Sequence, residues 1–505
     1  MLSQTRLKMR FLISIVLALL LSVNLFSQKE LVEGFNLLEE RNYEAAQVFF
    51  SDSTISQEFT RTAKICYGRA LGLGGNSTKA LSLFRKLAIE FPEDTEIGLN
   101  LAEALLWNNN YEEAIVVYQS LLTENPNSFV ANYGFANANA AINKDNLAIR
   151  FMDNALAIQP NSEQAHIAKN AILLKMAYNL SKSGNYTEAA SLINTIDLKY
   201  IEDSKVEQLS QSITQAIKTN ISLVHNSDKD SQENESTYYG LTIDFMFADR
   251  HRINLQTRYR QMADAKSSAA TQQRIALSDK IKLGKKLDFH MGLGVIGSAY
   301  EKYQDTRIIT STRLSGHLSE KLYTELGYEY DNLDFNLSLL KSELLINKYT
   351  LAANYMLTSR LGIYSRLQWQ VQSDANQLNS RIFSIYYSPN PNLGLKLGSN
   401  LSFQSYKYFS DAYFSPELYR HYEFFVLLEK TRQSGWTYSL LSNWGQQKIS
   451  DSPYQSTLKI EAKLGYLFKS GVSLMTEVKY NNAVEVNTAG AYTYSIYGVY
   501  LSYCL

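Results

Sequence analysis

The feature that most constrains the fold is a change in the spacing of apolar residues near residue 218. Beyond it, large apolar residues occupy every second position, as at Leu241, Ile243 and Phe245. A period of two gives a β-strand one apolar and one polar face. Segments of this kind run for about 10 to 15 residues, as transmembrane strands do. Residues 219–505 are therefore expected to form an antiparallel transmembrane β-barrel of about 14 to 16 strands, with a candidate first strand at 220–225.

A barrel of 16 strands is wide enough to enclose an aqueous channel. The polar run 226–236 is expected either to end the helical part of the chain or to form the first long loop. For each charged residue on the polar strand faces, taken singly, the alternative to a lumen role is a structural ion pair or a position in a loop. The alternation predicts that these residues face the lumen: Asp244, Arg252, Arg258, Arg260, Glu325, Glu329, Arg366, Glu423, Glu429, Lys459, Glu461, Lys463, Glu477 and Lys479.

Tyrosine usage and the last segment favour a membrane barrel. Of 35 tyrosines, 27 follow residue 218, and tyrosine suits the aromatic girdles at membrane interfaces. Gly498-x-x-Leu501-x-Tyr503 resembles the C-terminal signal read by the barrel-assembly machinery. The match departs from that signal because Cys504 and Leu505 follow the aromatic residue and Ile496 replaces the usual polar one.

The N-terminus predicts secretion. Lys8 and Arg10 precede an apolar run over residues 11–23, which is short for a membrane span. Residues 1–27 are expected to be a cleaved signal peptide, with an uncleaved anchor as the alternative. Cys66 and Cys504 lie far apart, in segments of opposite character, and are expected to be unpaired. The formal net charge of +0 gives no support to nucleic-acid binding.

Between residues 27 and 200 the sequence repeats with a period of 34, so residues 28–218 are expected to form a helical domain of four regular repeats and one degenerate repeat. Small residues at two fixed points let antiparallel helices approach closely, and proline stops the second helix of each pair. An aromatic residue or methionine follows each central alanine by four positions, at Phe50, Phe84, Tyr118 and Met152. The positions with a predicted packing role are Gly34, Gly68, Ala102 and Ala136; Ala46, Ala80, Ala114 and Ala148; and Pro92, Pro126 and Pro160.

The segments that begin at Asn42 and Asn110, together with this spacing, resemble the tetratricopeptide repeat. A degenerate fifth copy begins at Asn185, seven residues late, which a longer first helix would accommodate. The resemblance implies a curved solenoid that binds other proteins. The alternative is a spacer or an aid to barrel assembly. The whole chain is thus predicted to be an α + β multidomain protein, an N-terminal α-helical solenoid followed by the barrel.

A local motif resembles the cellulose-export outer-membrane proteins, which also place tetratricopeptide repeats before a barrel. The matching residues are Tyr413, Phe414, Ser415, Pro416 and Tyr419, although Asp411 and Ala412 replace the glycines that usually precede them. Pro416 cannot donate to a β-ladder, so the segment should be a turn ahead of a strand from Tyr419. Its aromatic residues would either stack on sugar rings or form only a rigid corner.

The resemblance implies an outer-membrane channel for an exopolysaccharide, with periplasmic repeats that meet periplasmic or inner-membrane secretion proteins. The alternative is a non-transporting outer-membrane anchor that presents the array to periplasmic partners. Expected partners are therefore outer-membrane lipid, secretion proteins and a polysaccharide chain in the lumen. An enzyme is disfavoured because His251, His290, His317 and His421 lack a neighbouring nucleophile in a recognisable motif. No catalytic residue, cofactor or metal site is predicted.

Overall fold

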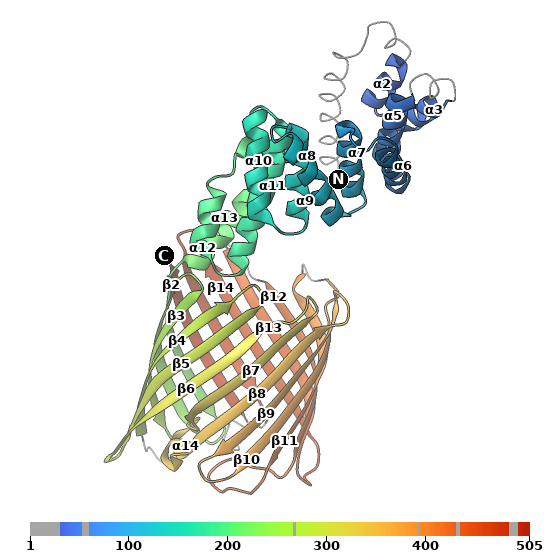
Figure 1. The fold of residues 1–505 in the computed structure, drawn as a ribbon. Helices are drawn as coiled ribbons and strands as arrows, with labels where there is room; N and C mark the ends of the chain where they lie inside the picture. The colour runs from blue at the N-terminus through green and yellow to red at the C-terminus, as the bar shows by residue number, and fades with distance from the viewer. Residues whose placement is uncertain (1–30, 53–59, 266–268, 391–392, 431–434, 484–492) are drawn as a thin grey trace. The chain divides into compact units, whose positions relative to one another are not determined.

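The computed structural model describes residues 31–52, 60–265, 269–390, 393–430, 435–483 and 493–505, so the predicted signal peptide lies outside the described residues. The chain separates into two compact units, one comprising residues up to 178 with 188–210, the other comprising 179–187 with 211–505. The helices, coloured blue to green in Figure 1, are α2 Val32–Glu39, α3 Tyr43–Ser51, α5 Thr60–Leu73, α6 Ser77–Glu90, α7 Thr95–Trp107, α8 Tyr111–Glu124, α9 Phe129–Ala141, α10 Asp145–Ile158, α11 Glu163–Lys182, α12 Tyr186–Ile193 and α13 Asp203–Ile217.

Helices α2 and α3, α5 and α6, α7 and α8, and α9 and α10 pack as the helix pairs of tetratricopeptide repeats. The small residues predicted to matter for packing lie inside these pairs. A Cβ atom added at Gly68 would lie 2.4 Å from the ring of Phe84, so a larger residue there would displace the ring. The prolines at 92, 126 and 160 each follow a helix end by two residues. Buried positions that recur every 34 residues are Ala46, Ala80, Ala114 and Ala148, and Phe50, Phe84, Tyr118 and Met152.

The turn inside each repeat contains one residue with a left-handed backbone. Arg41, Gly75, Asn109 and Asn143 have φ values of 63°, 91°, 60° and 63° and are 34 residues apart. In the fifth pair the corresponding residue is Gly184, at φ 84°. It arrives late because α11 has 20 residues, whereas α7 and α9 have 13 each. The delay seen in the sequence is therefore an extension of the first helix by about two turns.

The second part is a closed antiparallel barrel in which β1 pairs with both β2 and β16. Its strands run from green to red in Figure 1. Among the described residues the barrel has 16 strands: β1 Asn220–Asp230, β2 Glu235–Ala248, β3 His251–Ala263, β4 Ala269–Leu283, β5 Leu287–Tyr300, β6 Tyr303–His317, β7 Leu322–Asn332, β8 Leu345–Met356, β9 Leu361–Gln372, β10 Gln377–Tyr387, β11 Leu395–Tyr406, β12 Tyr419–Lys430, β13 Gly435–Ile449, β14 Gln455–Leu467, β15 Val472–Asn481 and β16 Tyr494–Cys504.

The two ends of the barrel differ. Asn220 pairs with Cys504, so the chain enters the barrel at the end that also holds the C-terminus. The connection between β2 and β3 at this end, residues 249–250, is short. Long connections, such as 333–344 and 407–418, lie at the opposite end, which we call the loop end. The chain segment predicted to turn ahead of a strand at Tyr419 does so at the loop end.

One sequence expectation about this part is wrong. The polar run 226–236 is not a long loop or the end of the helical part, because β1 continues to Asp230 and β2 begins at Glu235. Asn226 lies on the inner face, where its amide donates to the hydroxyls of Tyr238 and Tyr500 at 2.5 and 3.2 Å. Polar residues on both faces hid the alternation. Among the described helices, none is both long and apolar enough to cross a membrane.

Candidate functional site

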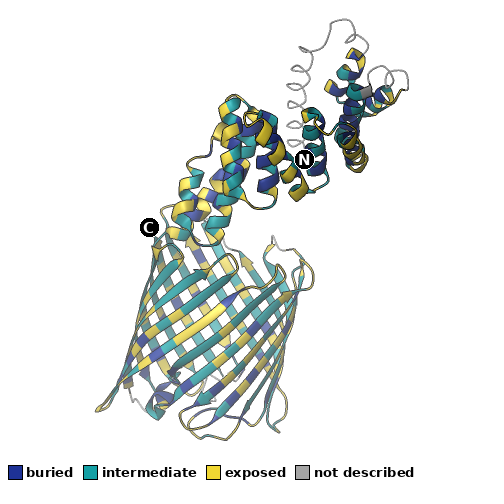
Figure 2. Cartoon of the chain, in the orientation of Figure 1, coloured by how far each residue is buried: buried dark blue, intermediate teal, exposed yellow. Residues whose placement is uncertain are grey.

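The barrel wall has one apolar and one polar face. On β9, Ile363, Leu367 and Trp369 are 40, 41 and 46% exposed, whereas Gln370, which follows Trp369, is 5% exposed. The ladder keeps this division across strands, since Leu367 pairs with Leu351, and Trp369 pairs with and stacks on Tyr349. Figure 2 shows the resulting alternation of exposure along the strands. An apolar outer wall with aromatic pairs around a polar interior is the arrangement of membrane β-barrels.

The structure places the sequence-predicted charged residues on the polar inner face, opposite the apolar ladder positions. Most of these charges are paired with one another or with inner residues that the sequence analysis omitted. The omitted partners follow the same alternation, which would have found them. The pairs are Arg252 with Asp244; Arg313 with Glu325 at 3.9 Å; Lys348 with Glu329 at 2.5 Å; Lys396 with Glu429 at 3.6 Å; Lys459 with Glu461 at 3.1 Å; and Lys463 and Lys479 with Glu477 at 2.9 and 3.2 Å.

Within the described residues, two predicted lumen cations, Arg258 and Arg366, have neither an ion pair nor the backbone hydrogen bonds that Arg260 makes. No residue of the described part of the chain forms an ion pair with Arg258 or Arg366. Arg258 instead lies over the ring of Tyr238, 4.9 Å from its centroid. Both arginines line an inner cavity of about 620 Å³, which residues of β3, β7, β9, β12 and β14 share. Since strands this far apart in the ladder meet only across the interior, the cavity is part of the lumen.

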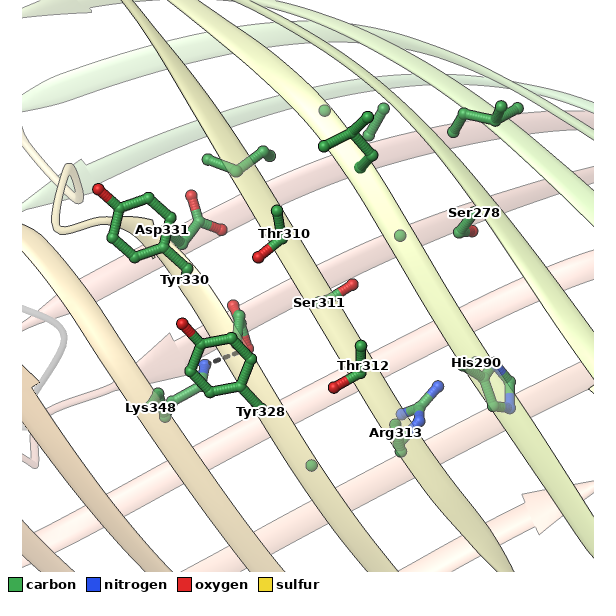
Figure 3. Close-up of a pocket in the computed structure, with 18 of the residues that line it drawn as sticks. Ser278, His290, Thr310, Ser311, Thr312, Arg313, Tyr328, Tyr330, Asp331 and Lys348 are labelled. Carbon is green, nitrogen blue, oxygen red and sulfur yellow. Dashed lines mark ion pairs between the residues drawn. The ribbon is translucent and has the colours of Figure 1, made fainter.

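The lumen cavities are lined by hydrogen-bonding groups. A second cavity, of about 340 Å³, lies along β3 to β8. Figure 3 shows Ser278, His290, Ser311 and Arg313 on its wall and the ion pair of Lys348 with a carboxylate, that of Glu329. In the larger cavity, Glu423 accepts hydrogen bonds from the amides of two asparagines, Asn400 and Asn443, at 2.7 and 2.6 Å. These walls offer amide, hydroxyl and charged groups to a polar solute.

The β7–β8 connection, residues 333–344, folds onto the inner wall and carries the short helix α14 Leu337–Ser342. Arg260, predicted only as a lumen charge, donates to the backbone oxygens of Asp334 and Phe335 at 2.8 and 2.5 Å. The side-chain amide of Gln272 donates to the Asp334 carboxylate at 2.7 Å. Arg307 donates to the backbone oxygen of Glu343 at 2.6 Å. Arginines of β3 and β6 therefore hold both ends of this connection, which we call the inner loop.

Apolar contacts fix the inner loop from two sides. Leu337 and Leu340, 1 and 4% exposed, cluster with Met262 and Ala270 of β3 and β4. Leu339, 1% exposed, belongs to a second cluster. That cluster joins it to these residues of β8, β10, β11 and the β11–β12 connection: Ile346, Leu378, Tyr406 and Tyr413. The inner loop thus bridges two sectors of the wall and occupies part of the lumen near the loop end. No spacing or motif in the sequence predicts this packing.

The export-like motif lies in the β11–β12 connection and forms a packed corner. Tyr413 is 6% exposed; its hydroxyl donates to Asp374 at 2.7 Å and accepts from the amide of Asn376 at 2.7 Å. Ser415, 3% exposed, accepts from the backbone N–H of Ser410 at 2.7 Å. Burial raises the pKa of the Tyr413 hydroxyl, so it stays protonated. Of the two roles predicted for the motif, this geometry favours the rigid corner.

Other aromatic residues of the same connection are exposed. Tyr408 is 53% and Phe409 80% exposed, and the ammonium of Lys407 lies 4.9 Å from the Tyr408 ring centroid. Together with Phe414 they line a hollow of about 1060 Å³ at the loop end. Tyr408 and Phe409 are therefore accessible to a ligand, whereas Tyr413 is not.

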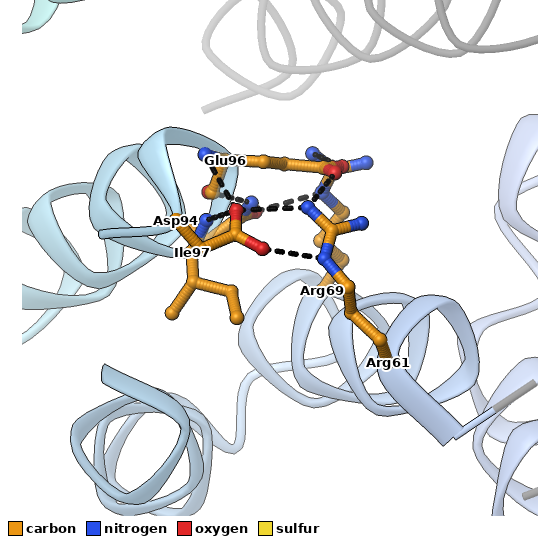
Figure 4. Close-up of polar contacts among 6 residues, drawn as sticks. Arg61, Arg69, Asp94, Glu96 and Ile97 are labelled. Atoms are coloured by element: carbon orange, nitrogen blue, oxygen red, sulfur yellow. Dashed lines mark hydrogen bonds and ion pairs between the residues drawn. The ribbon is translucent and has the colours of Figure 1, made fainter. Parts of the chain in front are cut away.

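In the helical array, polar contacts tie neighbouring repeats together (Figure 4). Arg61 donates two hydrogen bonds to Asp94, at 2.5 and 2.8 Å, and one to Glu96 at 2.9 Å. Asp94 also caps α7 by accepting from two of its backbone N–H groups. The hydrogen bond from Arg61 lowers the pKa of the Asp94 carboxyl. The buried Arg69 donates to Asn100 at 2.7 Å. These contacts join the second and third repeats.

The fold and its two surfaces define a tetratricopeptide-repeat array followed by a closed 16-stranded β-barrel of membrane type. The tetratricopeptide-repeat family matches residues 74–128 and 108–172. No curated protein matches the chain in sequence.

Solved structures resemble either the barrel or the array. A bacterial polysaccharide outer membrane secretin is 8% identical over 57% of this chain and 98% of its own, with a TM-score of 0.45. The Pseudomonas aeruginosa protein OccK7 is 10% identical over 57% of this chain and 98% of its own, with a TM-score of 0.34. A tetratricopeptide-repeat protein of Thermus thermophilus is 18% identical over 37% of this chain and 98% of its own, with a TM-score of 0.29. Since these TM-scores lie below 0.5, no function is inferred from them.

Proposed function

We propose that this protein is an outer-membrane conduit for a secreted polysaccharide, with its helical repeats in the periplasm as a docking array for secretion proteins. The observation that carries the proposal is the closed barrel whose outer wall is apolar and whose lumen is lined by hydrogen-bonding and charged groups. A transmembrane barrel of 16 strands is wide enough for an aqueous path.

The choice of a polysaccharide rests on the chemistry of the wall. Sugars present many hydroxyls and few charges, and the 620 Å³ cavity offers amides and hydroxyls, including those of Gln368, Ser380 and Ser402. Arg258 and Arg366 add positive charge that suits an acidic sugar chain. At the loop end, Tyr408 and Phe409 offer exposed rings. The resemblance of residues 413–419 to cellulose exporters agrees with this assignment.

The docking role rests on the array. Stacked tetratricopeptide repeats form an extended surface that binds protein segments, and the described repeats pack through regular buried positions. The proposed placement of the array in the periplasm is supported by the predicted signal peptide and by the short β2–β3 connection at the end where the chain enters the barrel, since outer-membrane barrels have short periplasmic turns and longer extracellular loops. Affinity purification compares the partners captured by the full chain with those captured by its Arg61→Glu variant. The substitution places a negative charge beside Asp94 and Glu96 and so disrupts the contact between two repeats. The comparison tests whether partner capture depends on an intact array.

A second function, a closed anchor for the array, has one observation in its favour. The inner loop occupies part of the lumen and is held by hydrogen bonds and two apolar clusters. If the inner loop never leaves the lumen, the barrel is only an anchor for the array. If the inner loop moves out of the lumen, the barrel is a gated conduit.

Planar-bilayer recording distinguishes the two functions. We expect the full chain to show rare openings, and a variant with residues 333–344 replaced by a short Gly-Ser linker to show a stable conductance. A linker variant that forms a folded barrel and carries no current would contradict the conduit.

A further inference from the structure

The outer wall carries positive charge near the loop end. Arg381 of β10 pairs with Phe403 of β11, Phe403 pairs with Arg420 of β12, and Arg420 pairs with Lys448 of β13. Direct ladder partners share a face, and Phe383, two residues from Arg381, is 42% exposed on the apolar outer wall. The three cations, which we call the outer basic row, therefore point away from the lumen.

The outer basic row lacks an acidic partner. Within the described residues, Arg381, Arg420 and Lys448 form no ion pair. Some other charges on the outer face are paired, as Lys229 is with Glu235 at 2.6 Å and Asp279 with His251 at 2.7 Å. A cation on the lipid face is costly at the membrane midplane and nearly neutral near the interface, where headgroups can solvate it. The row therefore needs an anion supplied by its surroundings.

Aromatic contacts place the outer basic row at headgroup depth. The rings of Phe403 and Tyr422 meet edge to face at 6.2 Å, and Tyr422 lies 6.4 Å from Tyr454. The ammonium of Lys448 lies 5.6 Å from the Tyr454 ring centroid. Tyrosines clustered with cations are typical of the girdle at a membrane interface. Long basic side chains at this level reach the headgroups of the adjacent leaflet.

The length and chemistry of the row indicate its ligand. Arg381 and Lys448 are three ladder steps apart, which is about 14 Å at the usual strand spacing. One phosphate does not reach across this distance, so the matching headgroup carries more than one anionic group. Guanidinium groups bind phosphate through two parallel hydrogen bonds. We propose that the outer basic row binds the phosphates of a phosphorylated glycolipid in the outer leaflet, which rests on the proposed outer-membrane location.

The test titrates the full chain in detergent with diphosphorylated lipid A and counts bound lipid by native mass spectrometry. We expect Arg381→Gln/Arg420→Gln to weaken binding by about tenfold or more, the effect of losing about 1.4 kcal/mol of interaction. The matched control, Arg258→Gln/Arg366→Gln, removes two charges from the inner face of the same barrel. It should bind lipid A as the wild-type chain does. Heat-modifiable migration on gels verifies that each variant forms the barrel.

Three results would overturn the assignment. One is equal lipid A binding by the outer variant and the wild-type chain. Another is equal binding of phosphorylated and dephosphorylated lipid A. The third is binding of phosphatidylglycerol as tight as that of lipid A, which would make the row a general collector of anionic lipid. Conductance of the same preparations, recorded in phosphatidylcholine bilayers, reports separately on the conduit, so failure of one proposal is distinguishable from failure of the other.

Discussion

Release of the inner loop should turn a mostly closed barrel into an open one. The perturbation is Arg260→Gln combined with Leu337→Ala, which removes the hydrogen bonds to the backbone oxygens of Asp334 and Phe335 and empties a site where Leu337 is 1% exposed. Hydrogen bonds to a charged group contribute about 1.5–3 kcal/mol, and a buried Leu→Ala change costs about 2–5 kcal/mol.

The lower bounds of these ranges give about 3.5 kcal/mol, and each 1.4 kcal/mol is about a factor of ten in an equilibrium. We therefore expect the open probability in planar bilayers to rise by two orders of magnitude or more. Arg258→Gln is the matched control, because it removes a nearby inner cation that contacts Tyr238 and not the loop. The reasoning is refuted if the double variant opens no more often than the control while the linker variant conducts.

Further predictions concern the lumen and the array. Replacing Arg258 and Arg366 with Glu should shift the ion selectivity of the linker variant toward cations; unchanged reversal potentials would mean that these side chains do not line the path. Asp94→Asn should destabilise the array by about 1–2 kcal/mol at neutral pH, because the amide still caps α7 but no longer offers a carboxylate to the hydrogen bonds that Arg61 donates. The folded-state pKa of Asp94 is lowered, so this stabilisation is present above the unfolded pKa and is lost as pH falls through the folded value. Helical circular dichroism of the full chain during thermal unfolding should therefore separate the two proteins at pH 7 and bring them together in strong acid. Gly68→Leu should cost about 1–3 kcal/mol through overpacking in the same assay, whereas a neutral effect would contradict the close helix contact. Burial raises the pKa of the Cys66 thiol to about 12, so Cys66 should resist alkylation at pH 8 until the array unfolds, and fast labelling of the native chain would contradict its burial.

The sequence predicted the features that repeat. A period of 34 placed the buried alanines of the array, and a period of two separated the faces of the strands. The first strand was predicted only as far as His225, because residues 226–230 are polar on both faces. The spacing of apolar residues therefore predicts a strand wherever apolar and polar residues alternate. It fails at the loop end of β1, where the residues on both faces of the strand are polar.

The inner loop and the motif corner depended on contacts that spacing does not reveal. In the sequence, Leu337, Leu339 and Leu340 are an apolar patch in a loop with no evident partner. The structure shows that they pack against residues of β3 and β10, which are distant in sequence. The role of Tyr413 is likewise set by Asp374 and Asn376, which belong to a different connection. Which lumen charges pair also depends on the strand register, as for Lys348 with Glu329.

The central claim, a conduit for a polysaccharide, is tested most directly by adding a polymer to the open channel. The full chain with residues 333–344 replaced by a linker is recorded in a planar bilayer while linear uronic-acid polysaccharides of increasing length are added to one side. We predict brief current blockades whose duration grows with polymer length and shortens in Arg258→Gln/Arg366→Gln. A stable open current that no polysaccharide interrupts would contradict the claim.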